Sequence, residues 1–432
     1  MRKDMFTIKT KSLGHFDVAV SGGGIAGVCA AVSAARTGAS VVLIERSGVL
    51  GGALTEGFIP LLLDSDNKGG IVAELYDFLN EHSMTIAKRG ERFDENGRPI
   101  PGRMVDTEGC KYFFDKICTD SGVKILFHSQ VAGAKMNGDT IESILVVTEC
   151  GNYSLDADVY IDATGNGLLA EFAGCAWDCG DPHDGRPSPT SHALCAVGMP
   201  ENYFGTDTPD DKNAYNDFLV QNGISISAEQ ACVKMLPSGQ TWNFGINFQY
   251  DVRPDDIESL SRATLEGRRE NFETIEAHKR LEGYEKLNTV FTSSHLGVRE
   301  GRRIYGEYRL TNDDILDGRR FDDGICLVRF GVDVHKLKKD DTTECDRGYR
   351  AKPYHIPYRC LLPKGVSNLM LAGRCISGDF YPHASYRVMG NMAATGEAAG
   401  FAAAKSSVAG ISPRAFDGRL VRDYMASLGY EI

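Results

Sequence analysis

The segment DVAVSGGGIAGVCAAVSAARTGASVVLIE, residues 17–45, constrains the fold more than any other part of this chain. It opens with a short β-branched run at 17–21 and continues into an Ala-rich stretch at 25–37 that is helical in character. The apolar run at 40–45 then has the length of a buried parallel strand. This succession predicts a βαβ unit.

The turn between the first strand and the helix carries Gly22-x-Gly24-x-x-Gly27. The first glycine permits a tight turn, the second lets the backbone approach a pyrophosphate, and the third lets the helix pack on the strand. Glu45 follows the second strand, where its carboxylate can accept both hydroxyls of a ribose and repels a 2′-phosphate. The motif therefore predicts a dinucleotide site and argues against NADP.

Two distant segments distinguish FAD from NAD. The first, YIDATGNG at 160–167, predicts a strand that delivers a small-residue turn to the same crevice. The second covers 368–400, where Gly378-Asp379 places a carboxylate suited to a sugar-like chain of hydroxyls. A helix starting near Gly390 would aim its N–H groups at an anion. FAD has a ribityl chain for such an acid and NAD has none, so we expect FAD.

Longer strings extend this interpretation over nearly the whole chain. They are SHLGVREGRRIYGEYRLT at 294–311, YHIPYRCLLPKGVSNLMLAGRCISGD at 354–379 and SYRVMGNMAATGEAAG at 385–400. With the N-terminal motif, they resemble the FAD-dependent oxidoreductase family built on a flavin domain of the glutathione-reductase type. The resemblance implies noncovalent FAD between a flavin domain and a mixed-sheet cap domain.

The resemblance also implies which residues hold the cofactor. Residues near its ADP half, pyrophosphate, ribityl chain and pyrimidine edge would be Gly22, Gly24, Gly27, Glu45, Arg46, Gly51, Gly52, Ala53, Val131, Ala163, Thr164, Gly165, Gly378, Asp379, Arg387, Val388, Gly390 and Asn391.

The expected fold class is α/β: a three-layer Rossmann-like FAD-binding domain with a β-meander, plus a mixed α+β substrate or cap domain. We expect the FAD-binding domain to comprise residues 1–178 and 355–432, with the cap domain between them at 179–354. No second glycine motif of this kind occurs in the sequence, so electrons are expected to pass through docked substrates or a separate donor or acceptor.

Several elements are expected from turn and capping residues. In the flavin domain these are a helix from Asp106 to Asp120, a strand at 123–127, a meander at Gln130–Lys135, Thr140–Thr148 and Asn152–Asp156, and a further strand at Val159–Asp162. In the cap these are a charged helix at 255–283 and strands at 242–250 and 324–332. Residues 88–105 resemble a polar hairpin or flap.

Composition limits the partners. The formal charge of −12 argues against nucleic acid, and no apolar run of 18 residues indicates a membrane span. The basic N-terminus lacks the apolar run of a signal peptide, so a cytoplasmic location is expected. The 12 cysteines lack zinc-site and disulfide-reductase spacing; no metal is expected, and Cys29 and Cys375 are interpreted as core residues.

Five residues are candidates for the chemistry: His383, Tyr381, Arg387, Arg299 and His192. His383 is the leading candidate base, with Tyr381 and Tyr386 as hydrogen-bonding partners of substrate, and Arg387 as a positive neighbour of the reduced flavin. His192 stands where an apolar strand residue is expected, and it and His295 are weaker candidates. For each histidine, a buried structural role is the alternative.

Arg299 belongs to a cluster with Arg302, Arg303 and Arg309, which suggests an anionic substrate; pairing with interleaved acids is the alternative. The expected reaction is hydride transfer between flavin N5 and a small polar substrate, either anionic or sugar-like. A flavin monooxygenase and a binding subunit with structural or regulatory FAD are the alternatives. The oligomeric state stays open.

Overall fold

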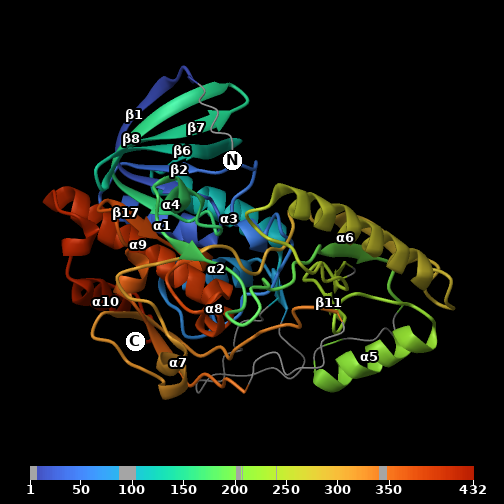
Figure 1. Ribbon diagram of the computed structural model, residues 1–432. Coiled ribbons are helices and arrows are strands. Elements are labelled where there is room, and N and C mark those ends of the chain that lie inside the picture. Colours follow the sequence, from blue (N-terminus) through green and yellow to red (C-terminus); the bar gives the residue numbers. More distant parts are fainter. Residues whose placement is uncertain (1–6, 87–103, 201–205, 207, 240, 340–347) are drawn as a thin grey trace.

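The computed structural model describes residues 7–86, 104–200, 206, 208–239, 241–339 and 348–432 (Figure 1). Most of the predicted hairpin at 88–105 lies outside these residues. Its last two residues form β4 (Met104–Val105), which pairs antiparallel with β3 (Thr85–Ile86).

The centre of the fold is a parallel sheet with the order β5-β2-β1-β8-β17. Its strands are β1 (Lys11–Ser21), β2 (Val41–Ile44), β5 (Lys124–Leu126), β8 (Gly151–Asp162) and β17 (Leu369–Leu371). All residues of β2 and β17 are buried, as expected for parallel strands covered on both faces. The predicted βαβ unit is confirmed by α1 (Ile25–Arg36) between β1 and β2.

One long strand joins this sheet to the meander. The meander strands β6 (Ser129–Asn137) and β7 (Thr140–Thr148) run antiparallel, and β7 pairs with the first part of β8. The last part of β8 pairs with β17. The prediction of separate strands at Asn152–Asp156 and Val159–Asp162 was wrong: only Ala157-Asp158 separates them, and neither residue type interrupts a strand as Gly or Pro would.

Helices α1 and α9 (Met389–Ala409) pack closely against each other and on the sheet. A Cβ on Gly396 or Gly400 of α9 would lie 2.0 or 2.1 Å from the backbone oxygens of Ala26 and Ala30. This proximity explains why both helices are rich in small residues. The helix predicted from Asp106 is α3 (Thr107–Asp120), and the Asp106 carboxylate caps it by accepting from the Gly109 N–H at 2.8 Å.

The segment between β17 and α9 contains a helix that was not predicted from the sequence, α8 (Phe380–Tyr386), with every residue buried. Tertiary packing explains the difference, because a seven-residue segment with Pro382 has little helical signal in isolation. The remaining helices of the flavin domain are α2 (Gly70–Glu81), α4 (Leu168–Phe172), α7 (Asn312–Asp317) and α10 (Gly418–Ser427). Short 3₁₀ turns occur at Gly52–Leu54, Tyr358–Leu361, Gly373–Cys375 and Pro413–Ala415.

The cap lies on the opposite side from α9 and α10 in Figure 1. Its antiparallel sheet has the order β11-β12-β10-β13. These strands are β10 (Leu194–Val197), β11 (Cys232–Met235), β12 (Trp242–Gly245) and β13 (Asn288–Thr292), accompanied by α5 (Pro209–Gln221) and α6 (Ile257–His278). A separate apolar cluster that includes Leu194, Phe244 and Ile275 forms its core.

The packing places the end of the middle region with the flavin domain. Strand β15 (Gly324–Val328) pairs with β16 (Tyr354–Pro357) and contacts α9 and α10. Apolar residues from Ile304 to Leu337 share one buried cluster with the parallel sheet. The assignment of the strand at 324–332 to the cap was therefore wrong, since its apolar side chains complete the other core. β14 (Arg303–Ile304) pairs with β9 (Trp177–Asp178).

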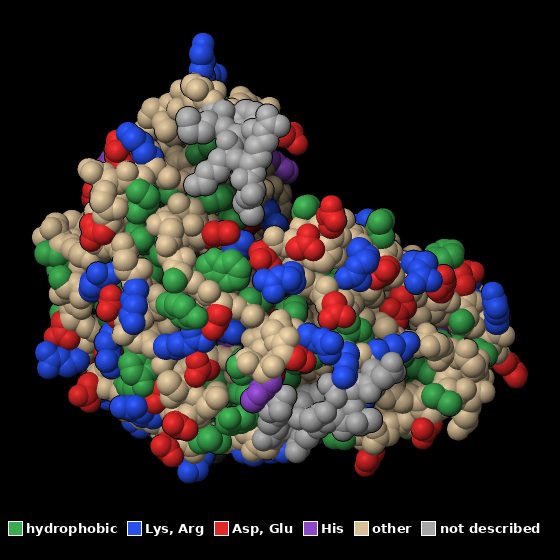
Figure 2. All heavy atoms as spheres, viewed as in Figure 1, with side chains coloured by type: hydrophobic (Ala, Val, Ile, Leu, Met, Phe, Trp, Pro, Cys, Tyr) green, Lys and Arg blue, Asp and Glu red, His purple; other side chains and the backbone are tan. Residues whose placement is uncertain are grey.

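On the face shown in Figure 2, acidic and basic side chains are intermingled. None of the helices in the described part of the chain is both long enough and apolar enough to cross a membrane.

Candidate active site

The carboxyl ends of the central strands meet at one edge of the sheet. Ser21 is opposite Ile44 on one side and Asp162 on the other, and Asp162 is opposite Leu371. The segments that follow these strands are therefore brought to one edge, although they are hundreds of residues apart. In open α/β sheets this is where ligands bind.

The glycine turn has the geometry expected from its spacing. Gly22 has a φ of +99°, which only glycine adopts without strain, and its N–H donates to the Ile44 oxygen at 2.8 Å. A Cβ on Gly27 would lie 1.8 Å from the Gly22 oxygen, whereas one on Gly24 would meet no atom within 4 Å. Gly24 therefore borders open space at the start of α1, where a phosphate group would approach.

The side chain of Glu45 organises this turn. Its buried carboxylate accepts from the Gly23 N–H at 2.6 Å and from the Ser47 N–H at 2.8 Å. Gly51 donates to the Gly23 oxygen at 2.8 Å, so the predicted Gly51-Gly52-Ala53 segment lies against the same turn. Local sequence thus brings together Glu45 and both glycine segments; ribose binding by Glu45 stays a prediction.

Two arginines at this edge have no carboxylate within ion-pair distance among the described residues. Arg46 hydrogen-bonds the His295 ring. Arg374 donates to the Val298 oxygen and to Asn166 Oδ1, and it covers Gly165. Burial and the like charges of Arg387 and Arg46 lower the pKa of Arg374 to about 10. Sequence reasoning missed Arg374; its position beside the DATGNG turn follows only from the pairing of β8 with β17.

The DATGNG turn adjoins the glycine motif. Ala163 donates to the Ser21 oxygen at 2.8 Å, and a Cβ on Gly22 would lie 2.5 Å from the Ala163 oxygen. Thr164 donates to the buried Asp162 carboxylate at 2.7 Å. Val131, by contrast, is buried in β6, where it pairs with Val146. Contact of the DATGNG turn and of Val131 with a cofactor stays a prediction.

The predicted ribityl-binding acid is held by an arginine. Asp379 begins α8, and its Oδ1 accepts from Arg309 Nε at 2.5 Å. The same guanidinium donates to Asp178 Oδ2 at 2.5 Å. Gly378 lies against Tyr386, where a Cβ would come within 2.7 Å of the ring. Asp379 is therefore fixed in orientation, with its side chain about one third exposed (32%).

The segment 387–391 holds unpaired polar groups. Arg387 donates from Nη2 to the Asp333 oxygen at 2.7 Å, but its Nη1 is buried without a partner among the described residues. Asn391 is fully buried, and in the described structure neither end of its amide has a partner. Buried polar groups are normally hydrogen-bonded, so these atoms point to a ligand.

The helix predicted to start near Gly390 is α9, and binding of an anion by its N-terminal N–H groups stays a prediction. α9 begins at Met389, with Val388 as its N-terminal capping residue, and Gly390 donates to the Leu63 oxygen at 3.1 Å. A loop from the N-terminal domain thus occupies this donor, and its approach is possible only because Gly390 lacks a side chain: a Cβ would lie 2.1 Å from the Asp64 oxygen.

His383 is buried on α8. Burial and the charges of Arg303, Arg387 and Arg374 lower its pKa well below 6.5, so the ring is neutral at physiological pH. Nε2 is buried without a partner in the described part of the chain. Tyr381 stacks on Tyr349, with ring centroids 4.2 Å apart.

The hydrogen bond of Tyr386 to substrate stays a prediction, and in the structure its hydroxyl donates to the Ile376 oxygen at 3.0 Å. That bond ties α8 to the loop before it, and burial raises the pKa of the tyrosine well above 10.

His192 precedes β10 and is fully buried. Its Nδ1 lies 3.2 Å from Ser293 Oγ, and Nε2 has no partner among the described residues. Burial, helped by Arg268, lowers the pKa of His192 to about 4. Burial and Arg46 lower the pKa of His295 to about 3. Both rings are therefore neutral, and a catalytic role for either stays a prediction.

The cysteines of the site are packing residues. Cys29 and Cys375 are free and buried, and burial raises both thiol pKa values well above 9, which disfavours a thiolate. Among the residues that the structure describes, no three His, Cys, Asp or Glu side chains are placed to hold a metal ion.

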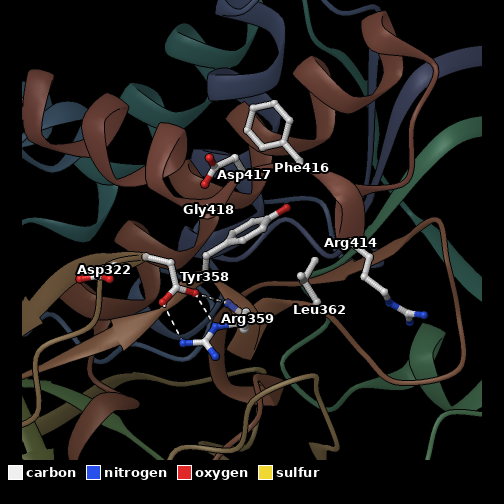
Figure 3. Close-up of a pocket in the computed structure, with 9 residues that line it drawn as sticks. Asp322, Tyr358, Arg359, Leu362, Arg414, Phe416, Asp417 and Gly418 are labelled. Carbon is white, nitrogen blue, oxygen red and sulfur yellow. Dashed lines mark hydrogen bonds and ion pairs between the residues drawn. The ribbon is translucent and has the colours of Figure 1, made fainter.

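A hollow of about 360 Å³ lies elsewhere, beside α10 (Figure 3). It is lined by Tyr358, Phe416 and charged residues; among these, Arg359 pairs with Asp323 at 2.8 Å and Arg414 with Glu307 at 3.0 Å. None of the predicted cofactor residues lines it, and we assign it no role in the chemistry.

Comparison with known proteins decides the family. The family model described as FAD dependent oxidoreductase matches residues 17–425. The chain belongs to this family. This flavoprotein therefore uses FAD and is an oxidoreductase.

Individual relatives are distant. An uncharacterized protein in nifH2 5′region of Methanosarcina barkeri is 28% identical over 179 residues, which cover 38% of this chain and 91% of that protein. The flavin-dependent brominase Bmp2 shares the fold, with a TM-score of 0.52 and 14% identity over 95% of this chain and 84% of its own. A geranylgeranyl bacteriochlorophyll reductase-like protein from Thermoplasma acidophilum aligns at a TM-score of 0.47 and 13% identity over 96% of this chain and 82% of its own.

The residues present fit FAD. Gly24 leaves open space at the start of α1, and Arg46 and Arg374 lack carboxylate partners among the described residues. Asn391 and Arg387 supply buried donors and an acceptor without partners in the same part of the chain. A diphosphate at the sheet edge and a polar ring near residues 387–391 would satisfy these groups.

Proposed function

We propose that this oxidoreductase transfers a hydride between flavin N5 and a small polar organic substrate, and exchanges electrons with a separate donor or acceptor in the cytoplasm. The observation that supports this proposal most is a group of buried polar atoms on residues 383–391 that have no partner among the described residues. This is where the sequence predicts the reactive ring. FAD, when bound, supplies the hydride-accepting atom; the protein must orient the substrate and move its proton.

Arg387 is suited to hold positive charge beside the cofactor. Its guanidinium is anchored by the Asp333 oxygen at 2.7 Å and by Asp333 Oδ2 at 3.2 Å, with Nη1 still available. A fixed cation of this kind stabilises negative charge that develops during reaction, without reorganisation. We assign it that role.

His383 is suited to accept a proton from the substrate. Its neutral ring can accept a proton or a hydrogen bond at Nε2, and three arginines influence it. The ring is a weak base, because burial and those three arginines disfavour its protonated form.

Replacing His383 by alanine is therefore expected to slow anaerobic bleaching of the flavin by substrate about 100-fold or more. The substrate is found with a panel of sugars, hydroxy acids and amines. His383→Asn serves as a second variant that preserves polarity, and His15→Ala changes an exposed histidine paired with Asp158 as the control. An unchanged reduction rate in His383→Ala removes this residue from the mechanism.

An assay of NAD(P)H oxidation with and without substrate, together with the anaerobic panel, separates the alternatives. A flavin monooxygenase would oxidise NAD(P)H rapidly only when its aromatic or other substrate is present. A subunit with structural or regulatory FAD would bind flavin that no member of the panel reduces at a useful rate.

A further inference from the structure

The arginine string at 299–309 contains one residue that differs from its neighbours. Arg302 pairs with Glu171 at 2.5 Å, Arg303 with Asp178 at 3.0 Å and with Glu300, and Arg309 with Asp178 and Asp379 at 2.5 Å each. These three arginines are structural, because their charges are used within the fold. Arg299 has no carboxylate within 4 Å in the described structure.

Arg299 is nevertheless held in one orientation. Its Nη1 donates to the Pro189 oxygen at 2.7 Å, and its guanidinium carbon lies 4.6 Å from the centre of the Phe248 ring. Stacking on an aromatic face fixes the plane of a guanidinium and leaves its edge for hydrogen bonds. A preoriented cation of this kind is suited to a planar anion.

No acidic side chain among the described residues forms an ion pair with Arg299. Asp333 is the nearby acid, but it binds Arg387 at 3.2 Å and faces His335 at 3.7 Å. Glu229 lies 3.9 Å from the other nitrogen of His335. Burial and the like charge of Arg387 lower the pKa of Arg299 to about 10, so it stays protonated without a carboxylate partner among the described residues.

We propose that Arg299 binds a carboxylate group of the substrate, which makes the substrate a small organic acid. This inference rests on the proposed function and deepens it. A chain of contacts links Arg299 to Arg387. The Phe248 ring that Arg299 stacks on lies edge-on to His335, with ring centroids 4.8 Å apart. His335 and Arg387 both contact Asp333. The substrate carboxylate would accept from those N–H groups of Arg299 that do not donate to the Pro189 oxygen, in the bidentate geometry that a guanidinium favours.

The test measures binding and needs no turnover. Purified holoprotein is titrated with succinate and benzoate, and with succinamide and benzamide as neutral counterparts, while the visible spectrum of the bound flavin is followed. At least one acid is expected to shift the spectrum with saturation, and its amide is not. Arg299→Gln is expected to raise the Kd of that acid roughly ten- to hundredfold, and Arg299→Lys is expected to raise it less.

Arg269→Gln is the matched control, because Arg269 is exposed on α6 and pairs with Glu273 at 3.4 Å. Equal binding of acid and amide, no shift with either acid, or an unchanged Kd in Arg299→Gln overturns the proposal. Loss of FAD from both Arg299 variants also overturns it, since Arg299 would then serve the cofactor. If the holoprotein binds acids but no substrate reduces its flavin, the proposed hydride transfer is contradicted instead.

Discussion

Replacing Gly24 by valine is expected to weaken FAD binding about 100-fold or more while the chain stays folded. A Cβ at Gly24 meets no protein atom within 4 Å, so the new side chain fits the ligand-free structure. It would occupy the space over the first N–H groups of α1, and losing hydrogen bonds to a charged phosphate costs several kcal/mol. The backbone at Gly24 is extended (φ −64°, ψ 174°), which valine adopts without strain.

The measurements are FAD affinity by calorimetry on flavin-free protein, and thermal unfolding of that protein. A loss of about 1 kcal/mol in stability is expected, because valine is a poorer N-cap than glycine. Gly133→Val in β6 is the control, since a Cβ there would make only ordinary contact with Leu145 at 3.7 Å. Wild-type affinity in Gly24→Val would show that the diphosphate binds elsewhere.

The second large effect is a pH-dependent loss of stability caused by Glu397. This carboxyl group is 2% exposed on α9; Tyr430 donates to it at 2.7 Å and the Ile71 N–H at 3.2 Å. Burial raises its pKa from the ordinary 4.5 to about 7, with Glu74 adding to the shift and Arg36 opposing it. The folded state therefore keeps a proton that the unfolded state releases.

The sign follows from that difference. Between pH 4.5 and about 7 the folded state binds more protons than the unfolded state, so the free energy of unfolding falls as pH rises and levels off above pH 7. The expected contribution is roughly 3 kcal/mol at 1.36 kcal/mol per pH unit. Glu397 links α9 to Tyr430 and to Ile71 of α2. Its ionisation therefore destabilises the contacts among these three segments.

Glu397→Gln keeps the size of the side chain and removes the titration. The variant is expected to lose most of the decrease in unfolding midpoint between pH 5 and pH 8, and to exceed the wild type at pH 8. Glu108→Gln, an exposed acid paired with Lys111, is the control. If Glu397→Gln and the wild type have the same pH profile, the carboxyl group is not protonated in the folded state.

The elements predicted well were those whose signals are local. The turn at Gly22, the helix α1 and the N-cap at Asp106 follow from short-range sterics and hydrogen bonding. The continuity of β8 was missed because two segments that pair with different partners were interpreted as two strands. Helix α8 was missed because burial, and not helix propensity, stabilises it.

The sequence by itself predicted the place of the dinucleotide turn, because glycine spacing and a following acid act within one βαβ unit. The distant segments at 160–167 and 368–400 favoured FAD over NAD. Only the tertiary structure decided which arginines are structural. Arg302 pairs with an acid 131 residues away, and Arg309 with acids 131 and 70 residues away. Arg374 hydrogen-bonds Asn166 of the DATGNG turn, 208 residues away, because β17 pairs with β8. The charge that an arginine leaves available depends on which carboxylates the fold brings within a few ångströms, and that distance is not written in local sequence.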